Sequence, residues 1–251
     1  EVPRMKNANN NKSLITDLSS DDPVVEAFRI IRFSLGYMRH STQVMMTTST
    51  TPGQGKSFVA RNMAAILAMA GKRGLVIDGD IRKRTLSGSF GHTFGLTTYL
   101  SDDHTQVADL IRTDAVVKGV DFLPSGPGPT PNPTELLMSD RLHQLMQQLR
   151  QMYDHIIIDS TPMFSVADAS IVNRESDITI FVLRAGVQNR DFLPDFERMY
   201  QEHRFNNLTV VVNDVNVDKR YGYGYGYGYG YGYGQNKKKS RVKRIINRLH
   251  K

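Results

Sequence analysis

The sequence predicts an α/β protein with a doubly wound, mainly parallel β-sheet that carries helices on both faces. Two observations lead to this fold class. Short apolar runs alternate along the chain with longer segments of helical periodicity. Most of the apolar runs are also continuous, as expected for parallel strands that are covered on both faces. A chain of 251 residues is long enough to bury a substantial core around such a sheet.

The expected elements follow in order along the chain. Asp21-Asp22-Pro23 is typical of a helix start, with an acidic cap and an early proline, and this helix should run to about Tyr37. Further helices are expected over residues 56–70, 134–152, 165–174 and 189–203. Strands are expected over residues 43–48, 74–78, 120–123, 155–159, 178–183 and 208–213. Ligands of such a sheet bind beyond the carboxyl ends of its strands.

Both ends of the chain differ in composition from the domain expected over residues 21–218. Residues 1–20 are polar and rich in Asn and Ser, which predicts a flexible lead-in. Residues 219–234 contain seven consecutive Tyr-Gly pairs, native or engineered, and glycine at every second position predicts a flexible tyrosine-rich tail. Residues 235–251 have apolar residues at helical spacing among Lys and Arg, which predicts a basic amphipathic segment.

The positive charge of the chain is concentrated in its C-terminal part. Residues 219–251 hold ten Lys and Arg and no acidic residue, whereas the rest of the chain holds 22 basic and 25 acidic residues. The globular part offers no basic groove, so no nucleic-acid partner is expected. An anionic membrane surface is a candidate partner for residues 237–251. The absence of cysteine excludes a disulfide framework or a thiolate metal site.

A glycine-rich segment between the first strand and the following helix predicts a phosphate-binding loop, and with it a fold of the P-loop NTPase type. In Ser49-Thr50-Thr51-Pro52-Gly53-Gln54-Gly55-Lys56-Ser57, the glycines let backbone N–H groups face phosphate oxygens. Lys56 can reach the β- and γ-phosphates, and the Ser57 hydroxyl can hold Mg²⁺. Thr50 stands where the usual motif has its first glycine. We expect nucleotide contacts from Pro52, Gly53, Gln54, Gly55, Lys56, Ser57 and Phe58.

Three carboxylates follow two of the expected strands. Asp78 and Asp80 come at the end of one strand and Asp159 at the end of another, so all three should lie on the edge that carries the loop. Carboxylates beside a triphosphate need Mg²⁺ between them. We therefore expect Ser57, Asp78 and Asp159 around the metal, with Asp159 in a Walker-B-like role. Asp80 is then a candidate to accept the proton of an incoming hydroxyl, with the division of roles among the aspartates left open.

Together these segments resemble the bacterial tyrosine kinases, which are cytoplasmic kinase domains tied to exopolysaccharide and capsule export. Residues 53–57 match the family's Walker A motif, residues 77–82 resemble its Walker A′ motif and residues 158–162 stand at Walker B. Residues 131–137 resemble a further family segment. Residues 26–32 match the family's E-x-x-R-x-x-R element, which is associated with ring-shaped oligomers. Gln54 stands where the family commonly has an acidic residue.

The resemblance implies an ATP- and Mg²⁺-dependent tyrosine kinase with Lys56, Asp78 and Asp80 as catalytic residues. It implies a ring-shaped homo-oligomer, such as an octamer, with protomer contacts from Glu26, Arg29 and Arg32. The implied phosphate acceptors are Tyr221, Tyr223, Tyr225, Tyr227, Tyr229, Tyr231 and Tyr233. Further implied partners are a membrane-spanning activator domain, fused or separate, and a tyrosine phosphatase. The implied location is the cytoplasmic face of the bacterial inner membrane, and the implied role is to regulate exopolysaccharide or capsule synthesis and export.

Two other functions remain as alternatives to a kinase. A MinD/ParA-like switch ATPase would use the basic segment 237–251 to bind a membrane, but the signature lysine of that group would fall at Thr51. A nucleotide-gated adaptor would use the tail as an interaction segment only. Glu26, Arg29 and Arg32 also have a simpler interpretation, because they lie roughly along one helix face and can form solvent-exposed ion pairs there.

Overall fold

A parallel sheet forms the centre of the protein. The computed structural model describes residues 1–5, 21–38, 42–89, 94–164, 167–187 and 189–216. The strands in this part of the chain are β1 (Val44–Ser49), β2 (Gly74–Asp78), β3 (Arg112–Val117), β4 (Val120–Leu123), β5 (His155–Asp159), β6 (Ile178–Arg184) and β7 (Thr209–Asn213). They pair in the order β3-β4-β2-β5-β1-β6-β7. Only β3, paired with β4, runs antiparallel to its neighbour within the described sheet.

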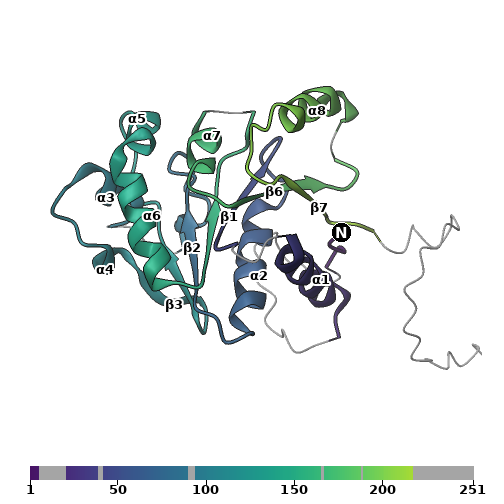
Figure 1. The fold of residues 1–251 in the computed structure, drawn as a ribbon, viewed down its shortest axis with the longest axis horizontal. Coiled ribbons are helices and arrows are strands. Elements are labelled where there is room, and N and C mark those ends of the chain that lie inside the picture. The colour runs from purple at the N-terminus through teal and green to yellow at the C-terminus, as the bar shows by residue number, and fades with distance from the viewer. Residues whose placement is uncertain (6–20, 39–41, 90–93, 165–166, 188, 217–251) are drawn as a thin grey trace, which may run out of the picture. The chain divides into compact units, whose positions relative to one another are not determined.

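Helices connect these strands and cover the sheet (Figure 1). They are α1 (Pro23–Met38), α2 (Lys56–Ala68), α3 (Leu96–Ser101), α4 (Val107–Leu110), α5 (Pro133–Met138), α6 (Asp140–Met152), α7 (Asp168–Asn173) and α8 (Leu193–Gln201), with 3₁₀ turns η1 (Ser87–Ser89) and η2 (Arg190–Phe192). The fold class expected from the sequence is confirmed. Asp22 caps α1 as expected, because its Oδ1 accepts a hydrogen bond from Val24 N at 2.7 Å.

Some elements differ from the sequence prediction for local reasons. The segment that forms β3 begins Arg-Thr-Asp and none of its residues is fully buried, so its apolar part is limited to residues 115–117. Helices α3 and α4 are too short to establish a helical period. The helix predicted over residues 134–152 is divided into α5 and α6 because Ser139 is extended, with φ −67° and ψ 151°.

Two hydrophobic cores lie on opposite faces of the sheet, and alternate residues of the strands contribute to each. Helices α1 and α2 pack with Met45 and Val76 on one face, whereas α3 to α8 pack with Met46 and Ile77 on the other. In Figure 1, β6 and β7 run between α8 above and α1 and α2 below. This double coverage explains the continuous apolar runs in the sequence.

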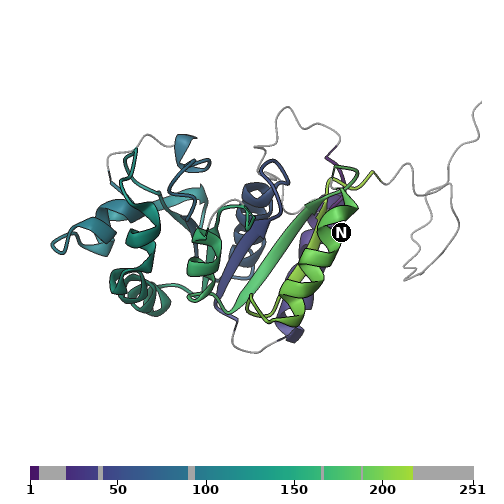
Figure 2. The ribbon, with the colours of Figure 1, turned by 90° about the horizontal axis from the view of Figure 1, so that it is seen from above.

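The first five residues of the chain differ from the flexible lead-in that was expected over residues 1–20. Val2 is fully buried, its N–H donates to Val212 O at 2.7 Å, and its carbonyl accepts from Val215 N at 3.0 Å. Arg4 N donates to Val215 O at 2.9 Å. Residues 1–5 therefore extend the sheet next to the end of β7, where the N-terminus lies in both views (Figures 1 and 2). Residues 6–20, the tail 219–234 and the segment 235–251 lie outside the described residues.

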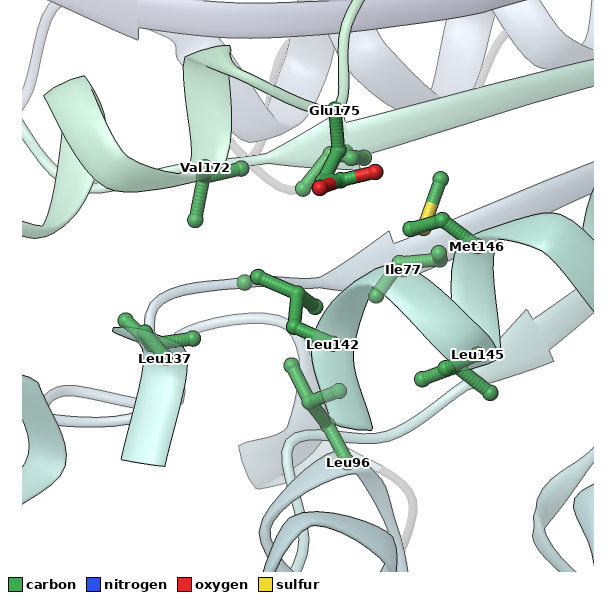
Figure 3. Close-up of a pocket in the computed structure, with 10 residues that line it drawn as sticks. Ile77, Leu96, Leu137, Leu142, Leu145, Met146, Val172 and Glu175 are labelled. Atoms are coloured by element: carbon green, nitrogen blue, oxygen red, sulfur yellow. The ribbon is translucent and has the colours of Figure 1, made fainter. Parts of the chain in front are cut away.

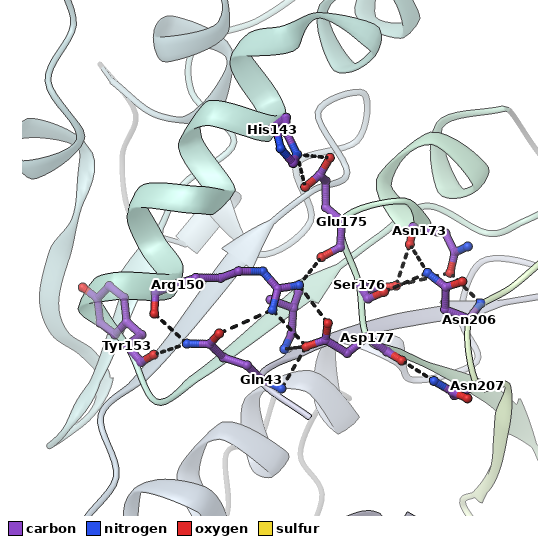
Figure 4. A network of polar contacts seen from close by, with 11 residues as sticks. Gln43, His143, Arg150, Tyr153, Asn173, Glu175, Ser176, Asp177, Asn206 and Asn207 are labelled. Carbon is purple, nitrogen blue, oxygen red and sulfur yellow. Dashed lines mark hydrogen bonds and ion pairs between the residues drawn. The ribbon is translucent and has the colours of Figure 1, made fainter. Parts of the chain in front are cut away.

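A polar network joins helix α6 to the starts of β1 and β6, at the edge of the sheet where the parallel strands begin (Figure 4). Arg150 forms a two-pronged ion pair with Asp177, at 2.9 and 3.1 Å. The same carboxylate accepts hydrogen bonds from the N–H groups of Gln43 and Val44, at 2.9 and 2.7 Å. The Gln43 amide donates to the carbonyls of Arg150 and Tyr153, both at 2.7 Å. At this edge the Asp177 carboxylate therefore accepts hydrogen bonds from four donors of the protein.

The core between the sheet and α6 contains a small apolar cavity (Figure 3). Ile77, Leu142, Met146 and Val172 are among its lining residues, and its volume is about 10 Å³. This volume is close to the lower limit for one water molecule, and Glu175 is the one lining residue with a polar side chain. The cavity is a packing defect rather than a ligand site.

Among the described helices, none is both long and apolar enough to cross a membrane.

Candidate active site

The loop between β1 and α2 has the backbone of a phosphate-binding loop. Gly53 and Gly55 adopt φ angles of 82° and 96°, a region that residues with a side chain avoid. A Cβ at Gly55 would also lie 2.1 Å from Asn213 Nδ2, so β7 leaves room only for glycine. Lys56 and Ser57 follow at once as the first residues of α2, whose N-terminal end favours anions.

Gln54 joins this loop to the neighbouring strands. Its side chain is buried, its Oε1 accepts a hydrogen bond from Arg184 N at 2.6 Å, and its Nε2 donates to Thr51 Oγ1 at 2.9 Å. Asn213 Nδ2 donates to the Gln54 carbonyl at 3.1 Å. An amide suits this place because it donates and accepts, whereas an ionised carboxylate only accepts. Gln54, expected to contact nucleotide, thus uses its side chain to support the loop.

Asp159 lies at the end of β5 beside the phosphate-binding loop. Ser57 Oγ donates to Asp159 Oδ2 at 2.5 Å, and Thr47 Oγ1 donates to Asp159 Oδ1 at 3.1 Å. Burial raises the pKa of Asp159, while Lys56 and the two hydroxyl donors lower it in part. The structure therefore brings together Lys56, Ser57 and Asp159 from segments that are about 100 residues apart in sequence.

Asp78 lies next to Asp159 because the two residues are register partners of β2 and β5. The pKa of Asp78 is raised to about 7, first by burial and then by the negative charge of Asp159, and the hydrogen bonds from Ser87 oppose the shift. Ser87 N donates to Asp78 Oδ2 at 2.7 Å, and Ser125 N donates to Ser87 Oγ at 2.8 Å. Two buried carboxyl groups thus lie side by side at one edge of the sheet, where their like negative charges repel each other.

A cleft opens over these groups, between the loop and the turn that carries Asp80. The cleft is lined by six of the residues expected to contact nucleotide, namely Pro52, Gly53, Gly55, Lys56, Ser57 and Phe58. Asp80 is 5% exposed and lines it as well, whereas Asp78 and Asp159 are at most 1% exposed and do not line it. Arg61, Lys83, Thr85 and Pro162 complete the lining and were not predicted. The cleft therefore combines cationic groups with one carboxylate at its surface.

The oxygen atoms at this edge fit a hard divalent cation. Ser57 Oγ, Asp159 and Asp78 supply hydroxyl and carboxylate oxygens, which Mg²⁺ prefers. The raised pKa values of both aspartates show that their negative charges lack full compensation from the protein. Within the described residues, no group of three or more His, Cys, Asp or Glu side chains forms a ready metal site. Mg²⁺ generally takes few protein ligands and completes its shell with phosphate and water.

The residues expected to form the ring contact have different environments on α1. Glu26 and Arg29 form an exposed ion pair at 3.1 Å. Arg32 instead donates from Nη1 to the carbonyl of Ile66 at 2.9 Å, which ties α1 to the end of α2. Ile30 and Phe33 are 57% and 65% exposed on the same helix. The tyrosines expected to accept phosphate lie outside the described residues.

Several residues that support the site have no signal in the local sequence. Arg184 donates from its N–H to the phosphate-binding loop, and its Nε lies 2.9 Å from Asp214 Oδ2. The sequence indicated Arg82 only as part of the motif over residues 77–82, and it indicated no role for its partner Asp168. These partners lie 130 and 86 residues apart in sequence, so no local pattern could have joined them.

The geometry so far defines a nucleotide-binding protein with a P-loop NTPase fold, and comparison with known proteins agrees. A family model described as an AAA domain matches residues 42–189. The tyrosine-protein kinase CpsD of Streptococcus agalactiae (serotype III, strain NEM316) is 32% identical over 194 residues, which cover 76% of this chain and 82% of CpsD. The solved kinase domain of the Escherichia coli tyrosine kinase ETK superposes with a TM-score of 0.74 at 28% identity, covering 92% of this chain and 93% of that domain.

The chain belongs to the family of bacterial tyrosine-protein kinases. The putative tyrosine-protein kinase EpsB of Ralstonia solanacearum is 37% identical over 168 residues, which cover 65% of this chain. This chain spans only 22% of the length of EpsB. Membership of this family favours a kinase over the switch ATPase and the adaptor that the sequence had left as alternatives.

Proposed function

We propose that this chain transfers phosphate from ATP to tyrosine residues of its own C-terminal tail. The observation that carries the proposal is the cleft, where Lys56, Ser57 and Asp80 lie together in front of the buried Asp159. Bound Mg²⁺-ATP would supply the phosphoryl group and neutralise its charge. Ser57, Asp159 and Asp78 would hold the metal, and the residues of the loop would hold the phosphates.

Each remaining residue has a role that follows from its position. Lys56 begins α2 and adds a positive charge where negative charge develops during transfer. Asp80 is the one carboxylate among the residues that line the cleft, which supports a role in accepting the proton of a tyrosine hydroxyl. A contribution of this kind is worth about 10²- to 10⁴-fold in rate. Gly53, Gly55 and Phe58 shape the wall against which the nucleotide lies.

The position of the last strand supports the tail as acceptor. Asn213 ends β7 and donates to the carbonyl of Gln54 in the phosphate-binding loop. The chain therefore leaves the described domain from the edge that carries the cleft. Fourteen residues of a glycine-rich chain span about 20 Å on average and at most about 50 Å. This reach suits the chain's own cleft or that of a neighbour.

We propose further that protomers form a ring through the exposed face of α1, with delivery of the tail to a neighbour's cleft. The Glu26–Arg29 pair and the exposed Phe33 support this contact, whereas Arg32 acts mainly within its own chain. By family resemblance, the kinase would act at the cytoplasmic face of the inner membrane to regulate exopolysaccharide or capsule export. A membrane-spanning activator and a tyrosine phosphatase would be its partners.

Incubation with labelled ATP followed by separation of tail, body and free phosphate tests the main proposal. Label on the tail supports the kinase, free phosphate without tail label supports a switch ATPase, and no turnover supports an adaptor. Lys56→Met should abolish the label, and deletion of residues 221–234 should remove the acceptor. Lys72→Met is the matched control, because Lys72 is an exposed lysine in a long ion pair with Asp154 at 3.9 Å.

Light scattering tests the ring with a similarly matched pair of variants. Arg29→Ala should reduce the size of the assembly. Arg198→Ala should not, although Arg198 forms the same type of exposed ion pair with Asp195 on α8. Equal sizes for the two variants and the unmodified chain would argue against the α1 contact.

A further inference from the structure

The side chain of Arg82 anchors the turn that carries Asp80, although Arg82 itself does not line the cleft. Arg82 Nε lies 2.6 Å from Asp168 Oδ2, and Arg82 Nη2 lies 3.1 Å from Asp168 Oδ1. Asp168 is the first residue of α7, and its side chain is only 1% exposed. A guanidinium fork on a buried carboxylate fixes both distance and orientation, which a single charged hydrogen bond does not.

A third segment completes this anchor. Arg82 Nη2 also donates to Thr134 Oγ1 at 2.8 Å, and Thr134 Oγ1 donates to Asp168 Oδ1 at 3.1 Å. Thr134 lies in the first turn of α5. The triad Arg82–Thr134–Asp168 therefore joins the Asp80 turn to two helices that take no part in the cleft.

The turn itself is short, so a shift of Arg82 must move Asp80. Lys83 N donates to Asp80 Oδ1 at 2.9 Å, and Arg84 N donates to Asp80 O at 2.7 Å. On the far side, the guanidinium of Arg84 lies against Gly128, where a Cβ would be 2.3 Å from Arg84 Cζ. Asp80 and Lys83 line the cleft, whereas Arg82 and Arg84 hold the turn from outside it.

We propose that Arg82 is a positioning residue for phosphate transfer, which holds Asp80 and Lys83 in the cleft through its fork on Asp168 and Thr134. The inference rests on the proposed kinase function. Reacting groups must lie within a fraction of an ångström of their productive position, and an error of 1 Å can cost about 10²-fold in rate. Loss of the fork should therefore slow transfer without weakening the phosphate-binding loop.

The test compares Arg82→Lys with Arg150→Lys. Both variants keep the charge and lose a two-pronged bond to an aspartate, but Arg150 pairs with Asp177 at the opposite edge of the sheet. The measurements are kcat, the KM for ATP, the affinity for Mg²⁺-ADP, the melting temperature, and hydrogen exchange at the amides of residues 81–84.

For Arg82→Lys we expect kcat to fall at least tenfold, with KM and ADP affinity within threefold of the unmodified chain. Exchange at residues 81–84 should rise at least tenfold. For Arg150→Lys we expect a lower melting temperature, unchanged exchange at residues 81–84 and unchanged kcat when assayed well below melting. Equal kcat values in the two variants at the same distance below melting would overturn the proposal, as would unchanged exchange in Arg82→Lys.

Two further results separate the possible failures. If the unmodified chain transfers no phosphate, the kinase proposal fails, while exchange and ADP affinity still decide whether Arg82 holds the turn. If Arg82→Lys does not fold, Thr134→Val removes one anchor and leaves the ion pair intact. This variant should lower kcat about three- to tenfold at an unchanged melting temperature, and an unchanged kcat would overturn the proposal.

Discussion

At the two edges of the sheet, the pKa values of carboxyl groups are shifted in opposite directions. At the edge where the parallel strands begin, burial alone would raise the pKa of Asp177, but hydrogen bonds from Arg150, Val44 and Gln43 outweigh it and lower the pKa. At the edge where they end, burial raises the pKa of Asp159 more than Lys56, Ser57 and Thr47 lower it. Donors of the protein therefore compensate the negative charge of Asp177, whereas they compensate that of Asp159 only in part.

This difference separates stability from function. The Asp177 network stabilises the fold because every strong acceptor meets a donor (Figure 4). The Asp78–Asp159 pair costs stability in the free protein, because two carboxyl groups lie side by side in a buried place. Such local conflict is typical of functional sites. Variants at the two edges should therefore differ in whether they lose activity or stability.

Asp159→Asn should have opposite effects on activity and stability. We expect phosphate transfer to fall more than about 10²-fold, because the proposed metal ligand, which is also the hydrogen-bond partner of Ser57, is lost. The raised pKa means that the charged form costs folding energy at neutral pH, so the nucleotide-free variant should be more stable. Turnover and urea unfolding without Mg²⁺ are the measurements. A less stable variant would show that Asp159 is compensated by the protein after all.

Arg150→Met should lower stability and leave activity intact. Arg150 is about two-thirds buried and forms charged hydrogen bonds to Asp177. Each such bond is worth about 1.5–3 kcal/mol, so we expect a loss of about 2 kcal/mol in the free energy of unfolding. Turnover per folded molecule should not change. A large loss of turnover at a temperature where the variant is folded would contradict the separation of the two edges.

The stability contributed by Asp177 should depend on pH. Its folded pKa is lowered, so its contribution is fully present above the unfolded value of about 3.9 and is lost as the pH falls through the folded pKa. The difference in unfolding free energy between the unmodified chain and Asp177→Asn should therefore be constant from pH 7 to 5 and shrink below about pH 4. Urea titrations at pH 7, 5, 4 and 3 measure this difference. A difference that stayed constant at pH 3 would show that the Asp177 charge contributes nothing.

Arg198→Ala should have the smallest effect, because its ion pair belongs to neither edge. Arg198 and Asp195 are more than half exposed on α8. An exposed pair of this kind contributes about 0.2–0.5 kcal/mol. We expect a melting temperature close to that of the unmodified chain and full turnover. A larger loss would mean that the exposed face of α8 contacts another part of the protein.

Local patterns predicted most of the fold and the centre of the site. The strands at Gly74–Asp78, Val120–Leu123 and His155–Asp159 were placed correctly because each is a buried apolar run between polar turns. Lys56 and Ser57 were found because the phosphate-binding loop is encoded within nine consecutive residues. Strand β3 was not predicted because only its last three residues are apolar and none of its residues is fully buried.

The contacts that support the site could not be predicted from the sequence, for a different reason. Gln54 was expected to contact the nucleotide and was noted as a departure from the family pattern, but its partner Arg184 belongs to a strand 130 residues away. Val2 lies in a polar segment, and its burial depends on the end of β7. Such contacts depend on tertiary packing, which a local pattern does not encode.

Mass spectrometry of the tail after incubation with Mg²⁺-ATP tests the central claim most directly. Asp80→Asn and Asp177→Asn each replace one carboxylate, at opposite edges of the sheet, and both should be assayed at a temperature where they are folded. The account predicts that Asp80→Asn loses tail phosphotyrosine and keeps its melting temperature, whereas Asp177→Asn keeps the phosphotyrosine and melts at a lower temperature. Normal tail phosphorylation in Asp80→Asn, or its loss in folded Asp177→Asn, would contradict the account.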